Sequence, residues 1–421
     1  MDKWPLIEQV LLGVFAAMWL YQVYFYLRYI LAAVRRTKAN VNCQMSNDKC
    51  QMTDYPLPGV SVIVCARNEE ANLRDYLQAL LTQDYPEYEV IIVNDGSVDN
   101  TRTYLEYWQQ RYKNLKVTFV PIGAKVASTK KLAITLGAKA AQYDYLLLTD
   151  ADCRPESTHW IREMMSGFTH LTAEGGQTAQ RSNSAAVAQR SAQTDIVLGF
   201  GAYFVKPGLL NRLIQFDTLF NGLQYLGQAV CGHPYMGVGR NLAYSKRLFF
   251  AHGGFEGLME NKAGDDDLFV NREATRTNTA VVCTRDSLTW SVPKTSLRDW
   301  LRQKRRHLSV APKYKLSTKL RLGLEPTTRG LLYAALIALI IVNCEMSFVN
   351  CQLSIAMLPA LIAIGAMLVR WIVQCVLLNI PAHRWGTRKT VLLIPVWEIV
   401  LPLITLVTML IEPFRPKPKR W

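Results

Sequence analysis

Long apolar runs near both ends of the chain flank a middle part in which apolar and polar positions alternate in short blocks. The first run covers residues 6–34 and ends at the basic residues Arg35 and Arg36. Three further apolar runs lie at 331–349, 353–378 and 391–411. Since a helix needs about 20 apolar residues to cross a bilayer, the pattern predicts an N-terminal membrane anchor and a C-terminal group of membrane helices.

The charges beside the first run predict its orientation. A signal peptide carries its positive charge before the apolar core, whereas here Arg35, Arg36 and Lys38 follow the run. By the positive-inside rule the next domain is then cytoplasmic. We therefore expect a multi-pass protein of the cytoplasmic (inner) membrane.

The last apolar run differs from the others. Three full crossings after a cytoplasmic domain would place the basic tail 413–421 outside. Because Pro395, Glu398 and Pro402 interrupt this run, we expect it to be re-entrant or interfacial rather than a plain span. A carboxylate within a membrane is costly, so Glu398 is predicted either to line a passage through the membrane or to pair with basic loop residues. These candidate partners are Arg384, Arg388 and Lys389.

The middle of the chain alternates between strand and helix patterns. Short β-branched or apolar runs at 60–66, 90–93 and 145–149 predict buried strands, and helical periodicity follows the first two. This rhythm predicts an α/β fold with a mainly parallel sheet, whose ligands bind beyond the carboxyl ends of the strands. The expected organisation is an anchor, a linker, the α/β domain, an interfacial linker, membrane helices and a basic tail, at 1–36, 37–57, 58–310, 311–330, 331–412 and 413–421.

Acidic residues follow two of these strands. Asp95 comes after the strand at 90–93, and Asp150-Ala151-Asp152 ends the strand at 145–149. Hard cations such as Mg²⁺ and Mn²⁺ take oxygen ligands, and a carboxylate pair suits a cation that also binds a diphosphate. Taken alone, Asp-x-Asp is more often a solvated turn.

Residues 58–310 resemble the catalytic domain of a family 2 glycosyltransferase. The matching segments are 64–70, 93–99, Lys130 with Ala133 and Ile134, 150–152, 264–268 and 303–307. The resemblance implies the Rossmann-like GT-A fold, a nucleotide diphosphate sugar as donor, with uridine as the default base, and Mg²⁺ or Mn²⁺ as cofactor. It also implies inversion by a single displacement.

The resemblance assigns the donor side of the site. Asp152 is the expected metal ligand, and Asp150 is expected nearer the ribose and the outer shell of the metal. Lys130 would face the diphosphate, although a solvated lysine in the basic run 125–131 is an equal alternative. The residues expected to contact the nucleotide are Ala66, Arg67, Asn68, Glu69 and Asp95.

The acceptor hydroxyl loses a proton during transfer, so a carboxylate must lie on its side of the donor. Residues 264–267 read Gly-Asp-Asp-Asp, where the family usually shows Glu-Asp followed one residue later by Asp-Leu. Alignment on Asp267 and Leu268 places the catalytic base at Asp265, with Asp266 as the second candidate. The cluster would equally serve as an acidic helix N-cap, and both functions are compatible.

Residues 303–307 resemble the Gln-x-x-Arg-Trp motif of membrane-embedded cellulose and hyaluronan synthases. Arg306 is expected to bind the diphosphate, while Gln303 and His307 are expected at the acceptor. His307 replaces the tryptophan, which favours shorter products over a long processive polymer. A basic interfacial segment beside anionic lipid is the alternative. Gly239 and Arg240 resemble the acceptor-side segment of the family.

Charge and cysteine content fit a membrane setting. The formal net charge is +15, and many basic residues lie beside apolar runs, which favours anionic lipid as partner and not nucleic acid. Nine scattered cysteines predict reduced thiols rather than a disulfide framework. A short repeat links 41–52 with 342–353, and we interpret it as inserted loop sequence without a catalytic function.

Together these features predict a membrane-bound inverting glycosyltransferase of cell-envelope polysaccharide biosynthesis. Its acceptor would be lipid-linked or a polysaccharide, and other envelope-biosynthesis proteins are candidate partners. Two alternatives stay open, a nucleotidyltransferase with the same sheet and a catalytically silent membrane scaffold.

Overall fold

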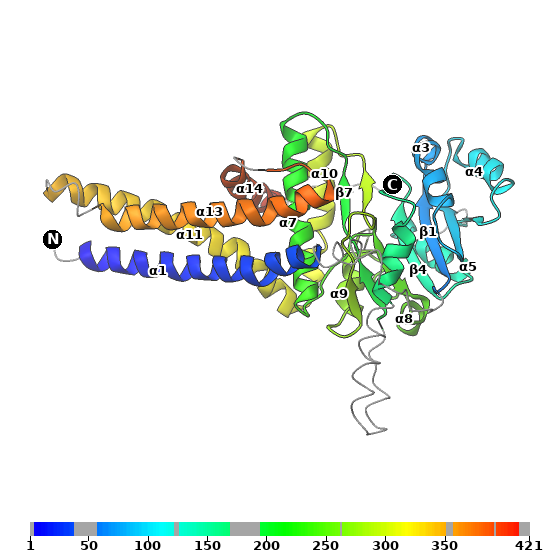
Figure 1. The fold of residues 1–421 in the computed structure, drawn as a ribbon, viewed down its shortest axis with the longest axis horizontal. Helices are drawn as coiled ribbons and strands as arrows, with labels where there is room; N and C mark the ends of the chain where they lie inside the picture. Colours follow the sequence, from blue (N-terminus) through cyan, green and yellow to red (C-terminus); the bar gives the residue numbers. More distant parts are fainter. Residues whose placement is uncertain are drawn as a thin grey trace, which may run out of the picture.

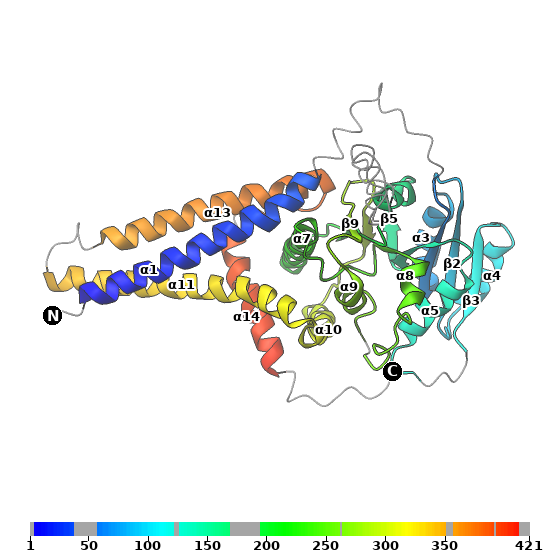
Figure 2. The ribbon, with the colours of Figure 1, turned by 90° about the horizontal axis from the view of Figure 1, so that it is seen from below.

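The computed structural model describes residues 4–37, 57–121, 126–168, 194–261, 263–350, 357–390 and 393–411. Long helices lie side by side at one end of the molecule, and a sheet domain forms the other end (Figures 1 and 2). Helix α7 (Leu209–Val230) lies between them.

A seven-stranded sheet in the order β3-β2-β1-β4-β8-β6-β9 forms the centre of the α/β domain. Strands β1, β2, β3 and β4 are parallel, whereas β8 runs antiparallel to both β4 and β6. The predicted mainly parallel α/β fold is thus confirmed. The strands are β1 (Val60–Ala66), β2 (Tyr88–Asn94), β3 (Leu115–Phe119), β4 (Tyr145–Asp150), β6 (Ile196–Leu198), β8 (Leu242–Ser245) and β9 (Thr279–Val281).

Helices bury both faces of this sheet. Val62 and Val64 of β1 pack in one cluster with Leu73 of α3 (Glu70–Leu81), whereas Ile63 packs in another with Ile134 of α5 (Thr129–Ala140). Covering on both faces explains why the strands read as continuous apolar runs. Two further helices of this half are α4 (Thr101–Gln109) and residues 160–168.

A second sheet in the order β5-β10-β7 extends the domain toward the helices. Its strands are β5 (Cys153–Pro155), β7 (Gly201–Tyr203) and β10 (Thr289–Ser291). Short helices complete this half, namely α8 (Lys246–Ala251), α9 (Asp267–Glu273), α10 (Leu297–Leu308) and η3 (Ala311–Lys313). Because β5 follows Asp152 directly, this sheet continues the edge at which β4 ends.

Three described helices are long and apolar enough to cross a membrane, at Leu6–Thr37, Leu316–Glu345 and Leu358–Trp385. The first comprises α1 (Trp4–Phe25), a π-helical turn η1 (Tyr26–Ile30) and a helical continuation to residue 37. The others belong to α11 (Leu316–Asn350) and α13 (Leu358–Trp385).

Helix α11 begins well before the apolar run from which it was predicted, so most of the expected interfacial linker 311–330 is helical. Its polar first half packs against α1, where the Gln22 amide donates hydrogen bonds to the Glu325 carbonyl (3.0 Å) and the Thr328 hydroxyl (3.0 Å). Contact with α1 thus satisfies polar groups of a segment that the sequence alone suggests to be a linker.

The run 391–411 forms the shorter helix α14 (Ile394–Ile411), which crosses the long helices steeply (Figure 2). Its fully described part, Ile394–Thr408, is apolar but shorter than the three candidate spans, so the expectation that it is re-entrant or interfacial stays a prediction. Glu398 of α14 is fully buried and accepts hydrogen bonds from Arg370 Nη1 and Nη2, both at 2.8 Å. The expected pairing with Arg384, Arg388 or Lys389 is wrong, because α13 brings Arg370 to the same buried junction.

The described cysteines are free thiols. The first copy of the short repeat (41–52), residues 351–353 of the second copy and the basic tail 413–421 lie outside the described residues.

Candidate active site

The carboxyl ends of β1, β2 and β4 meet at one edge of the sheet. Ala66 pairs in register with Asn94, and Cys65 pairs with Asp150. The loop after β1, the loop that begins with Asp95, and the Asp150 turn therefore lie next to one another. Residues expected to share a site are adjacent because their strands are parallel neighbours.

Two loops join to form one wall of this edge. The Asp95 amide donates to the Ala66 carbonyl (2.8 Å), and the Val98 amide donates to Asn68 Oδ1 (2.8 Å). Asn68 has a left-handed backbone (φ 57°), a conformation that asparagine tolerates better than most residues. Arg67 forms a loose ion pair with Asp95 at 3.8 Å. The predicted nucleotide-side residues thus belong to one hydrogen-bonded surface.

Lys130 connects the two acidic segments of the sequence. Its Nζ lies 2.9 Å from Asp150 Oδ1 and 3.0 Å from Asp265 Oδ2. Burial opposes its charge, but Asp150 and then Asp265 raise the pKa of Lys130 well above its ordinary value. Lys130 is therefore a bridging cation in a small cleft that it lines together with Asp150, Gly239 and Asp265, and not a solvated lysine of the basic run.

The adjacent Lys131 was not predicted as a site residue. It is fully buried, and its Nζ donates to the carbonyl oxygens of Leu258 (3.0 Å), Asn261 (2.6 Å) and Ala263 (2.7 Å). These bonds fix the loop that leads into Asp265. The only sequence signal was two consecutive lysines in the first turn of a helix, which necessarily point in different directions.

The three aspartates at 265–267 have three different partners. Asp266 caps α9 by accepting from the Asp267 amide (2.8 Å), and its second oxygen accepts from the Gly239 amide (2.8 Å). Asp267 accepts from the Tyr314 hydroxyl (3.0 Å). The N-cap interpretation therefore holds for Asp266, and Asp265 is the member that contacts Lys130.

The pKa values of the three carboxyl groups also differ, because their partners differ. Burial opposes ionisation of Asp265, but the Lys130 ammonium prevails and lowers its pKa. Burial and then the Asp265 charge raise the pKa of Asp266, and burial and then Asp266 raise that of Asp267 well above its usual range. Asp265 is thus the member of the cluster best kept as a carboxylate, the form that accepts a proton.

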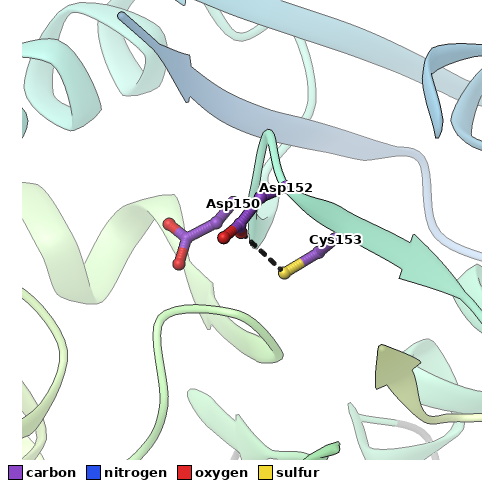
Figure 3. A group of neighbouring side chains, drawn as sticks. All are labelled: Asp150, Asp152 and Cys153. Carbon is purple, nitrogen blue, oxygen red and sulfur yellow. Dashed lines mark hydrogen bonds between the residues drawn. The ribbon is translucent and has the colours of Figure 1, made fainter. Parts of the chain in front are cut away.

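Asp150 ends β4, Asp152 lies in the turn that follows, and Cys153 begins β5. Their ligand atoms all lie within 4.8 Å of one another (Figure 3). Burial and then the neighbouring Asp150 charge raise the pKa of Asp152, and a bound cation would relieve this repulsion. Burial also raises the pKa of the Cys153 thiol, which lies 2.9 Å from the Ser291 hydroxyl. The two carboxylates fit a hard divalent cation, whereas a neutral thiol is a poor ligand for one.

Arg240 joins this turn to the second sheet. Its guanidinium donates to the Gly201 carbonyl (3.0 Å) and the Ser291 hydroxyl (3.3 Å), and it lies 4.3 Å from the centre of the Tyr203 ring. Gln303 of α10 donates to the hydroxyl of the same tyrosine (2.8 Å). Tyr203, which was not predicted, therefore brings two expected acceptor-side residues together.

Helix α10 carries the remaining predicted residues. Lys304 binds Asp217 of α7 (2.8 Å), which anchors α10. His307 lies exposed in the last turn of α10. Among the residues that the structure describes, no carboxylate forms an ion pair with Arg306, so this exposed guanidinium can bind an anion.

The sequence of this domain matches the family model "Glycosyl transferase family 2" over residues 61–225. The poly-beta-1,6-N-acetyl-D-glucosamine synthase of Staphylococcus epidermidis is 37% identical over 94 residues, 22% of either chain. The beta-monoglucosyldiacylglycerol synthase of Synechocystis sp. is 38% identical over 99 residues, 23% of this chain and 20% of that one. The match thus spans about a fifth of the length of these two relatives.

Among solved structures, the mannosyltransferase PcManGT from Pyrobaculum calidifontis, in complex with GDP-Man and Mn²⁺, has a TM-score of 0.48 at 19% identity. That similarity covers 89% of this chain and 99% of the other. Staphylococcus aureus TarS residues 1–349, in complex with UDP-GlcNAc, has a TM-score of 0.37 at 16% identity, covering 78% of this chain and 88% of the other.

Proposed function

We propose that the chain transfers a sugar, with inversion, from a nucleotide diphosphate sugar to an acceptor at the cytoplasmic membrane face. The match of residues 61–225 to the model of glycosyl transferase family 2 supports this proposal. The observation that carries this proposal is the Lys130 bridge between Asp150 and Asp265. It connects the strand end expected to hold the donor with the carboxylate expected to act on the acceptor.

The donor side consists of the sheet edge and α10. The walls around Asn68 and Asp95 would enclose the nucleotide, and the exposed Arg306 would bind the diphosphate through its planar guanidinium. Asp150 and Asp152 would hold Mg²⁺ or Mn²⁺, which when bound neutralises the charge that develops on the leaving diphosphate.

On the acceptor side, Asp265 would accept the proton of the attacking hydroxyl. Lys130 keeps this carboxylate ionised before the acceptor arrives, and the Lys131 bonds hold the preceding loop in place. Tyr203, Gln303, Arg240 and His307 would form the acceptor wall. A single displacement needs one base and no covalent nucleophile, which fits this arrangement.

The names of the relatives support a saccharide or glycolipid product. The Staphylococcus epidermidis relative is named a polysaccharide synthase and the Synechocystis relative a glucosyldiacylglycerol synthase. We propose a UDP-sugar as donor and a lipid-linked or polysaccharide acceptor, with short products because His307 stands where processive synthases carry tryptophan.

Nucleoside diphosphate release by the full chain in detergent, measured against a panel of nucleotide sugars with Mg²⁺, Mn²⁺ or chelator, tests the proposal. We expect metal-dependent release from one donor, lost in Asp152→Asn and Asp265→Asn. The matched control is Asp84→Asn, which removes an exposed carboxylate that pairs with His159 and Arg162.

Each alternative predicts a different result. Equal release by wild type and both site variants would refute the residue assignments. Pyrophosphate release from a nucleoside triphosphate and a sugar phosphate would indicate a nucleotidyltransferase. No release from any donor, even with added membrane lipid, would favour the silent scaffold.

A further inference from the structure

A cavity of about 520 Å³ lies where the first apolar helix meets the end of α7, away from the cleft. Four arginines line it, Arg28, Arg35, Arg36 and Arg276, together with apolar side chains such as Leu27 and Val230. The α7 residue that anchors α10, Asp217, precedes Val230 by several turns. At 1.5 Å of rise per residue this separates the cavity from the α10 anchor by about 20 Å.

The helix backbones hold this cavity in shape. Gly227 of α7 touches the π-helical turn η1 so closely that a Cβ atom would lie 2.0 Å from the Tyr29 carbonyl oxygen. The Cys231 thiol donates to the Arg28 carbonyl (3.0 Å). The π turn, a feature often found at functional sites, is thereby fixed against α7, and Arg28 with it.

The positive charge of the cavity is not compensated. Within the described ranges, no carboxylate forms an ion pair with any of the four arginines. Partial burial, then the charges of Arg321 and Arg28, lower the pKa of the nearby His233. A concave surface with several guanidinium groups and no counter-charge attracts an anion, and guanidinium matches phosphate oxygens in particular.

An apolar stripe leads along the helix to these arginines. Leu20, Tyr24 and Leu27 follow one another at helical spacing and are 62%, 51% and 53% exposed. They lie within Leu6–Thr37, a helix long and apolar enough to cross a membrane, which ends beside α7 (Figure 1). An apolar stripe that ends in arginines matches a molecule with an acyl chain and an anionic head.

We propose that this cavity binds the phosphate headgroup of an anionic phospholipid, with an acyl chain along the stripe Leu20, Tyr24 and Leu27. The inference stands on the arginines, the cavity and the apolar helix, and is independent of the proposed transfer reaction. Because η1 and α7 form the cavity wall, a bound lipid would fasten the sheet domain to the bilayer surface.

Native mass spectrometry of the full chain in neutral detergent, titrated with phosphatidylglycerol, tests this proposal. We expect the double substitution Arg28→Gln with Arg35→Gln to weaken phosphatidylglycerol binding about 30-fold, since each basic residue near an anionic lipid surface contributes about a factor of five. Phosphatidylcholine should bind more weakly than phosphatidylglycerol. The control Arg102→Gln with Arg111→Gln removes the same charge from the far side of the sheet domain and should change binding less than about twofold.

Three results would overturn the proposal: equal binding by wild type and the cavity variant, an equal loss in the control, or phosphatidylcholine binding as tightly as phosphatidylglycerol. If inorganic phosphate at the same concentration as phosphatidylglycerol displaced it, the cavity would be a site for free phosphate, and the proposal of lipid binding would be refuted. If the glutamine variant does not fold, two other variants test the proposal. They are the charge-preserving pair Arg28→Lys with Arg35→Lys and the single exposed substitution Arg35→Gln. Binding must persist in the first and weaken in the second.

Discussion

Two clusters of partly or fully buried charged groups in the described part of the chain differ in their charge balance. In the cleft, the carboxylates of Asp150 and Asp265 share Lys130, Asp152 lies beside Asp150, and the bridging lysine is 40% exposed. In the helix bundle, Glu398 and Arg370 are 0% and 1% exposed and pair through two hydrogen bonds. The cleft retains unneutralised negative charge on a solvent-accessible surface. The bundle pair is closed, and with the adjoining Arg329 and Glu325 it is balanced.

This difference distinguishes a site from a structural contact. A buried pair without spare charge has nothing to offer a ligand, and removing one partner leaves the other uncompensated. A bound cation stabilises a cleft with excess carboxylates, and these carboxylates are available to act in a reaction. The bundle pair joins α13 to α14, and α14 in turn packs against α10 and α7, so we expect it to support the cleft only indirectly.

Asp265→Asn should produce the largest effect. The amide cannot accept the proton of the acceptor, so we expect the transfer rate to fall about 10²- to 10⁴-fold with little change in nucleotide binding. Steady-state kinetics and isothermal titration with the nucleoside diphosphate measure the two quantities. A rate within twofold of wild type would show that the cleft cluster is structural, like the bundle pair.

Glu398→Gln should act on stability instead. It leaves the Arg370 guanidinium buried without a charge partner, which costs about 3–5 kcal/mol, measured as thermal unfolding in detergent. The double substitution Glu398→Gln with Arg370→Gln should recover part of this loss. An unfolding curve unchanged in the single variant would contradict the proposed difference between the clusters.

Lys130→Gln should shift the pH dependence of the reaction. In the wild type, Lys130 lowers the pKa of Asp265, so the carboxylate form persists as the pH falls. Without the cation the pKa rises, and the acid limb of the kcat/KM profile moves to higher pH. Lys130→Arg, which keeps the charge, should leave the limb nearly in place. An acid limb at the wild-type position in Lys130→Gln would exclude Asp265 as the titrating base.

Lys131→Met should lower kcat about tenfold with a smaller change in donor KM, because three loop carbonyls lose their common donor. The matched control on the same helix is the exposed Lys139→Met. If both variants have wild-type kcat, the loop before Asp265 is fixed by other contacts.

His307→Trp should have the smallest effect on rate, within about threefold, because the residue does not contact the reacting carboxylates in our proposal. We expect longer products, seen as a shifted length distribution by mass spectrometry. An unchanged distribution would remove the argument that His307 limits product length.

Local sequence determined the strands, the long apolar helices and the edge of the sheet at which the candidate site residues gather. The runs 60–66, 90–93 and 145–149 are apolar because both sheet faces are covered, and parallel pairing then places Ala66, Asp95 and Asp150 at one edge. The Asp266 cap was likewise predictable, because it depends only on the residues that follow it.

Tertiary structure decided which charged groups meet. Lys130 pairs with Asp150, which follows it by 20 residues, and with Asp265, which lies much further along the sequence. Glu398 pairs with Arg370 and not with the basic loop residues that are nearer to it in the sequence. Arg28 and Arg276 share a cavity although about 250 residues separate them in the sequence. Such pairs depend on the path of the chain through space, because periodicity and capping report only on neighbours within a few turns.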